Sequence, residues 1–88
     1  NCISYSALTI MIAKMCDLEP YEFIHYGGDC HIYSDHVEQC QEQISRDPYP
    51  FPTLEILRKR DDINDYVLED FKLHDYQHHP QLKGAMRA

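Results

Sequence analysis

The chain has 88 residues, and because a chain of this length buries only about 60% of its unfolded surface, it forms one small domain or part of a larger one. Its formal net charge of −7 argues against binding nucleic acid through the phosphate backbone, which requires clustered cations. Its apolar stretches are shorter than the ~20 residues of a membrane span, so we expect neither nucleic acid nor a membrane as a partner.

Residues 2–16 are predicted to form a helix that Asn1 caps and that ends before Pro20. Apolar side chains occupy every face of this helix, a pattern typical of helices inside large proteins or membranes. The rest of the chain is too polar to surround such a helix. We therefore expect the chain to be the end of a larger domain, or one half of an intimate oligomer, in which this hydrophobic helix is buried.

Residues 22–33 carry apolar and aromatic side chains around a glycine pair, which predicts extended chain with a bulge or kink at the glycines. A second helix is predicted over residues 34–45, capped by Ser34 or Asp35, with Glu38 completing a capping box. Its apolar face is thin and consists of Val37, Cys40 and Ile44.

The second half of the chain is more polar. The closely spaced prolines of residues 47–52 predict an extended connector, because proline disfavours helix at its own position and at the one before. Short strands are predicted on either side of a turn, so the chain as a whole is of mixed α/β class (α+β). In order, the expected elements are a strand over 53–59, a turn over 61–65, a strand over 71–76 and a polar tail over 78–88.

Four cysteines in a short chain could form a disulfide framework with three possible pairings. However, Cys2 and Cys16 fall in the predicted buried helix and Cys40 in the second helix, where cysteine commonly serves as a small apolar residue. Reduced thiols are therefore expected, and with them a cytoplasmic location.

The densest polar cluster is residues 29–36. Because side chains alternate along extended chain, Asp29, His31 and Tyr33 are expected to share one face. The imidazole and the phenol could together hold one hydroxyl group of a ligand, one group donating and the other accepting. The alternative is that backbone groups satisfy both side chains.

A zinc site built from Cys30 or His31 together with His36 and Cys40 is a second interpretation of the same region. The spacing matches no common zinc pattern, and a fourth ligand would have to come from elsewhere, so we expect no metal.

The basic residues Arg58, Lys59 and Arg60 are followed at once by Asp61 and Asp62. This order predicts a solvated turn in which neighbouring charges neutralise one another.

Residues 27–36 resemble the thymidylate synthase family, whose signature there reads Gly-Asp-x-His-x-Tyr, followed by a short polar step and His. The likeness extends along the whole chain, and it also rests on residues 1–8, 46–52, 69–71, 76–80 and 83–88. It implies that residues 1–88 are the C-terminal third of a single thymidylate synthase-like domain with a twisted β-sheet.

The resemblance implies that the complete enzyme methylates dUMP to dTMP, with 5,10-methylenetetrahydrofolate as co-substrate, as a cytoplasmic homodimer without a metal. The family's nucleophilic cysteine lies in a Pro-Cys-His motif that none of the four cysteines here matches. The family's phosphate-binding arginines are also expected outside this segment. The segment then holds no catalytic residue of its own. A folate-dependent hydroxymethylase of deoxypyrimidine nucleotides and an inert fragment are the alternatives.

Five residues carry implied roles. Asn1 matches the asparagine that reads the pyrimidine, where related deoxycytidylate hydroxymethylases have Asp. His31 and Tyr33 match the pair that binds the 3'-hydroxyl of the deoxyribose. Met86 and Ala88 match the tail that closes over the folate. At Arg87, between them, the chain departs from the apolar ending usual in the family.

Overall fold

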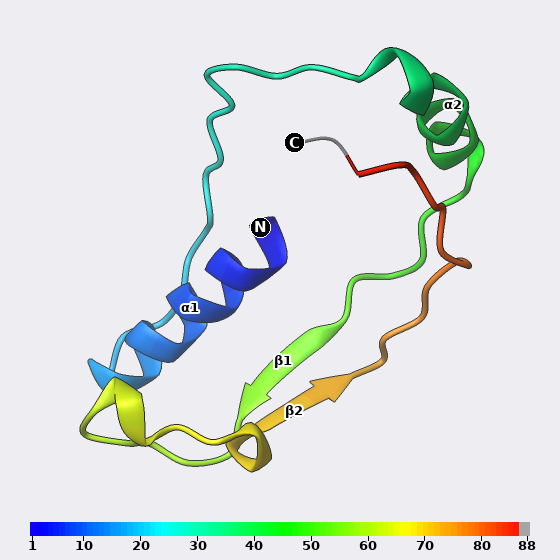
Figure 1. Cartoon of the computed structure of the whole chain (residues 1–88). Helices are drawn as coiled ribbons and strands as arrows, with labels where there is room; N and C mark the ends of the chain where they lie inside the picture. Colours follow the sequence, from blue (N-terminus) through cyan, green and yellow to red (C-terminus); the bar gives the residue numbers. More distant parts are fainter. Residues whose placement is uncertain (87–88) are drawn as a thin grey trace. The chain divides into compact units, whose positions relative to one another are not determined.

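The computed structural model describes residues 1–86, which contain two helices and one two-stranded antiparallel sheet, as the mixed class predicted (Figure 1). The chain divides into two compact units: residues 1–26 with 51–76, and residues 27–50 with the segment from Gln77. The elements are α1 (Cys2–Met15), α2 (Val37–Ser45), β1 (Thr53–Ile56) and β2 (Phe71–His74).

Helix α1 begins directly after Asn1 and ends close to where the sequence predicted. The Asn1 side chain makes no capping hydrogen bond, so the predicted position of the cap is right but the predicted interaction is wrong. At the other end, Asp17 adopts a left-handed φ of 56°, and the Leu18 N–H donates to the Ala13 carbonyl at 2.8 Å. A left-handed residue with such a bond is a common way to end a helix.

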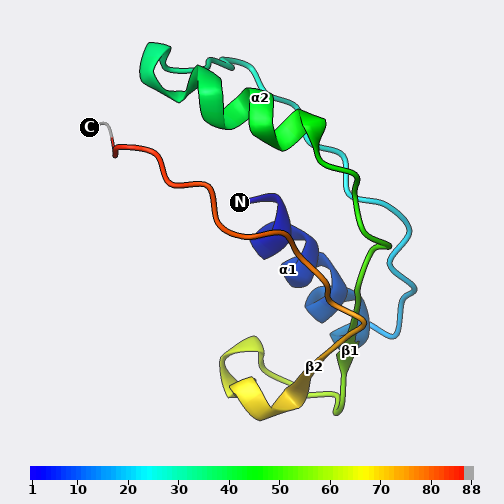
Figure 2. The same ribbon diagram turned by 90° about the vertical axis from the view of Figure 1, so that its right-hand side faces the viewer.

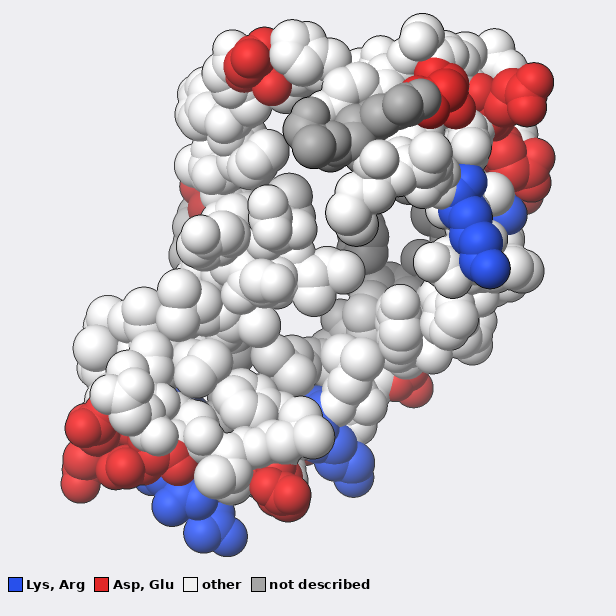
Figure 3. Space-filling model, viewed as in Figure 1, with Lys and Arg blue, Asp and Glu red and all other residues white. Residues whose placement is uncertain are grey.

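The apolar surface of α1 is only partly covered by the described residues. Ala13 is its only buried residue, while Ile3 is 84% exposed and Tyr5 57% exposed. Figure 3 shows an uncharged surface over this helix, with charges of both signs gathered over the segment that joins β1 to β2. The burial expected for a helix that is apolar all round is therefore only partly provided within residues 1–86.

Strands β1 and β2 pair in an antiparallel register that places Leu54 opposite Leu73 and Ile56 opposite Phe71. Ile56 is only 7% exposed and is the main buried side chain of the sheet. Both strands are shorter than predicted. In β2 the reason is visible at Asp75, whose left-handed φ of 58° is incompatible with continued strand geometry.

The connection between the strands contains two short 3₁₀ turns, Ile63–Asp65 and Leu68–Asp70. The second turn brings Asp70 next to the basic residues that follow β1. Asp70 is 2% exposed, and its carboxylate accepts hydrogen bonds from the Arg60 guanidinium at 3.0 and 3.1 Å. The Arg58 Nε lies 3.3 Å from the same carboxylate. We call this group of Asp70, Arg58 and Arg60 the carboxylate clasp.

The clasp corrects the prediction that Asp61 and Asp62 neutralise the basic residues. The hydrogen-bonded Arg60 guanidinium holds the pKa of the Asp70 carboxyl below its usual value. Lys59 pairs with Asp17 at 2.7 Å, and that hydrogen bond raises the pKa of Lys59. Asp70 is delivered by the second 3₁₀ turn and Asp17 follows the end of α1, so both partners are distant in sequence from the basic residues.

In the second unit, α2 is preceded by a 3₁₀ turn, Ser34–His36. The predicted helical span is confirmed, but the predicted cap is wrong, because Tyr33 and His36 occupy the cap positions and neither makes a side-chain capping bond. Residues 22–33 form no strand; the only local feature is a bend at Gly28 and Asp29. Neither helix in the described range is long and apolar enough to cross a membrane.

Candidate functional site

His31 and Asp29 lie on one face of the extended segment that leads into α2, as side-chain alternation predicted. The Nε2 of His31 lies 2.8 Å from the Oδ1 of Asp29, and both side chains are exposed. Because a carboxylate can only accept, the proton is on Nε2, and Nδ1 of the neutral ring is then an acceptor. The contact thus orients the imidazole and leaves it one polar atom for another partner.

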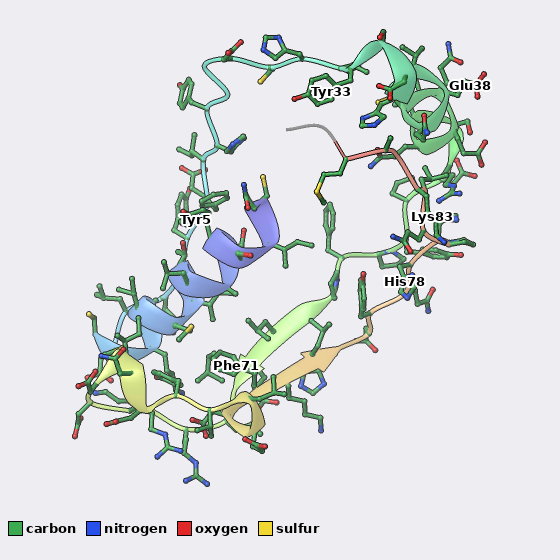
Figure 4. The ribbon with its side chains drawn as sticks, in the orientation of Figure 1. Tyr5, Tyr33, Glu38, Phe71, His78 and Lys83 are labelled. Carbon is green, nitrogen blue, oxygen red and sulfur yellow. The ribbon has the colours of Figure 1, made fainter. Side chains whose placement is uncertain are left out.

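Tyr33 follows on the same segment, and Figure 4 labels its side chain beside the start of α2. It is 52% exposed, and its hydroxyl makes no hydrogen bond within residues 1–86. The rings of Tyr33 and His36 contact each other edge to face, with centroids 5.6 Å apart and planes at 84°. The packed ring fixes Tyr33 while its hydroxyl stays open to a ligand.

Asn1 belongs to the first unit, at the start of α1. Its carbonyl accepts the Tyr5 N–H at 3.0 Å, whereas its exposed side-chain amide does not cap the helix. The amide can therefore serve another partner. Because His31 and Tyr33 belong to the second unit, their assembly with Asn1 into one site stays a prediction.

The segment from Gln77 is anchored on α2 and on the 3₁₀ turn before it by side chains that donate to its backbone. Gln39 Nε2 donates to the Lys83 carbonyl at 3.0 Å, and His36 Nε2 bonds the Ala85 carbonyl at 2.7 Å. Figure 4 shows Lys83 on this tail, whose described part follows β2 in Figure 2. We call His36 and Gln39 with the pocket of about 380 Å³ beside them the tail cradle.

In the tail cradle, the side-chain oxygen of Gln39 is a hydrogen-bond acceptor without a donor. Its Oε1 is buried and accepts no hydrogen bond within the described residues. A buried acceptor without a partner is unfavourable, so the pocket favours an additional donor at this point.

A second anchor lies earlier on the tail. Arg46, just after α2, donates to the Pro80 carbonyl at 2.8 Å. His79 stacks on Tyr49 with centroids 4.6 Å apart, and its Nε2 bonds the Asp47 carbonyl at 2.8 Å. The proline-rich connector and the tail are thus held together within this unit.

The cradle does not follow from the apolar face predicted for α2. In the described residues that face is largely open to solvent, with Ile44 84% exposed and Val37 44% exposed. The usable signal was polar: positions 36, 39 and 43 carry His, Gln and Gln at spacings of three and four, which places them on one side of the helix.

Of the two predicted tail residues, Met86 and Ala88, the first lies within the described range. Met86 is 97% exposed and lies at the end of the described range, whereas Arg87 and Ala88 lie outside it. No group of three or more His, Cys, Asp or Glu side chains able to hold a metal occurs within residues 1–86. All four thiols are free.

Comparison with known proteins gives a consistent result. A family model described as thymidylate synthase matches residues 1–88. A thymidylate synthase of Francisella philomiragia is 58% identical over 86 residues, and one of Francisella tularensis subsp. holarctica is 54% identical over 86 residues. Each alignment covers 98% of this chain but only 31% of the relative, so the chain spans about a third of the length of these proteins.

Proposed function

Because the family match covers the whole chain, these 88 residues belong to the thymidylate synthase family, and we propose that the protein containing them methylates dUMP to dTMP. The one-carbon donor and reductant is 5,10-methylenetetrahydrofolate. Residues 1–88 act as the C-terminal part of a single domain of a cytoplasmic homodimer. None of Cys2, Cys16, Cys30 and Cys40 stands in a Pro-Cys-His motif, so the nucleophile belongs to the remaining length of the enzyme.

Asn1 reads the pyrimidine in this proposal. Its amide N–H₂ donates to O4 of uracil, and its amide oxygen accepts from N3–H. Cytosine presents a donor and an acceptor at the same two positions in reversed order, so it leaves both amide groups unpaired. The absence of a side-chain cap at α1 supports this role, because it leaves the amide available.

His31 and Tyr33 hold the 3'-hydroxyl of the deoxyribose. The Nδ1 of His31 is the acceptor, since Asp29 occupies Nε2 at 2.8 Å. The phenol of Tyr33 is the donor, and it is exposed, with its ring packed on His36. The two groups therefore offer the complementary pair that a hydroxyl requires.

The tail closes over the folate through Met86 and Ala88. The exposed thioether of Met86 gives the flexible apolar contact suited to a large planar ligand. The charged Arg87 between them distinguishes this tail from the apolar ending of the family.

The test of nucleotide reading is Asn1→Asp in the intact enzyme. We expect the ratio of kcat/KM for dUMP to that for dCMP to fall about tenfold or more, because a carboxylate repels O4 and, when protonated, pairs with cytosine. Asn64→Asp is the matched control, since it makes the same change in the exposed turn between β1 and β2. An unchanged ratio for Asn1→Asp would refute the assignment.

A further inference from the structure

The side chain of His36 contacts two parts of the second unit that have different proposed roles. On one side it meets the ring of Tyr33 edge to face at 5.6 Å, and on the other its Nε2 lies 2.7 Å from the Ala85 carbonyl. A carbonyl oxygen only accepts, so Nε2 carries the proton and donates. One imidazole therefore bridges the nucleotide-reading segment and the tail.

The fit of the tail around this imidazole is close. A Cβ placed on Gly84 would lie 3.0 Å from His36 Nε2 and 3.1 Å from its Cδ2, so the glycine lets the tail backbone approach the ring. With Tyr33 packed from the other direction, the ring has little freedom to move without moving one of its neighbours.

We propose that His36 is a positioning residue that couples nucleotide binding at Tyr33 to the placement of the tail. The inference rests on the proposed function and deepens it. A nucleotide that fixes the Tyr33 phenol also fixes the ring packed against it, and a fixed ring holds its Nε2–H on the Ala85 carbonyl. dUMP thus strengthens the anchoring of the residues just before Met86.

Comparing loss of Gln39 with loss of His36 distinguishes coupling to the nucleotide from simple anchoring of the tail. It holds the Lys83 carbonyl at 3.0 Å, two residues before Ala85, and it has no ring contact with Tyr33. Loss of Gln39 should loosen the tail but leave the effect of dUMP intact, whereas loss of His36 should remove both.

Trypsin reports on the cradle directly, because Lys83–Gly84 is a cleavable bond whose carbonyl Gln39 holds. The experiment treats the intact enzyme with trypsin, with and without saturating dUMP, and follows release of the segment after Lys83 by mass spectrometry. We expect dUMP to slow this cleavage several-fold in the wild type. His36→Leu should cleave about fivefold faster without dUMP, for one lost hydrogen bond, and dUMP should then change the rate less than twofold.

Gln39→Leu should also cleave about fivefold faster but keep the full slowing by dUMP. Gln41→Leu is the matched control, because Gln41 is exposed on the same helix, and it should behave as the wild type. Wild-type rates in His36→Leu, or undiminished slowing by dUMP in that variant, would overturn the proposal.

Calorimetric titration of the wild type with dUMP distinguishes failure of the coupling from failure of the proposed function. Binding without any change in cleavage overturns the coupling and leaves the proposed function standing. No binding overturns the proposed function and the coupling together.

Discussion

The two units of the chain are held together in different ways. The first contains paired strands, the buried Ile56 and the carboxylate clasp around Asp70. The second has no buried residue in the described range and is held by His36 and Arg46, which flank α2 and bond the tail backbone. Within the described residues, the first unit therefore has a small core and the second is held by hydrogen bonds.

This difference matches the placement of the proposed roles. His31, Tyr33 and Met86 all belong to the second unit, where single hydrogen bonds to exposed backbone replace a core. Elements that must move around ligands are drawn from the less stable parts of a structure. Asn1 is the exception, since it stands at the start of α1 in the first unit, where a fixed base-reading group is an advantage.

Among the variants that test this difference between the units, Asp70→Asn should have the largest effect on stability. It leaves the guanidinium groups of Arg58 and Arg60 facing an amide in a buried position, so the thermal midpoint of the intact protein should fall by several degrees. Glu69→Gln removes the same charge from the adjacent exposed residue and should change the midpoint little. Equal midpoints for the two variants at pH 7 would show that the clasp does not stabilise the first unit.

The difference between these variants should depend on pH in a defined direction. The folded pKa of Asp70 lies below its ordinary value of 3.8, so its stabilisation is fully present above that value. It is lost as pH falls through the folded pKa, where the carboxyl is protonated in both states. The gap in thermal midpoint between Asp70→Asn and Glu69→Gln should therefore narrow below about pH 3.8.

A smaller effect is expected from Ile56→Val, which removes one methylene group from the buried face of the sheet. The free energy of unfolding of the intact protein, from urea denaturation, should fall by about 1 kcal/mol. Ile44→Val makes the same change on α2 at a side chain that is 84% exposed, and it should have almost no effect. Similar decreases in the free energy of unfolding for both variants would show that the first unit has no more of a core than the second.

Local patterns predicted the regular elements well. The bounds of α1 followed from Asn1 and Pro20, and the positions of β1 and β2 from short apolar runs beside turn residues. These signals lie within a few residues of the structure they specify, so they can be recognised along the chain.

Contacts between distant residues were not predictable in the same way. Arg60 was assigned to Asp61 and Asp62 because they are adjacent, whereas the 3₁₀ turn at Leu68–Asp70 delivers a buried partner ten residues on. The bond from His36 to Ala85 spans 49 residues. Neither turn geometry nor tail position follows from hydrophobic periodicity, so both pairings needed the folded backbone.

The nucleotide roles of Asn1, His31 and Tyr33 rest on the family, and the central claim concerns the reaction they serve. The most direct measurement supplies the intact enzyme with dUMP and 5,10-methylenetetrahydrofolate and quantifies both products. Methylation uses the folate as reductant, so we predict one dihydrofolate for each dTMP formed. Release of tetrahydrofolate with a hydroxymethylated nucleotide, or no nucleotide product at all, would contradict the proposed function.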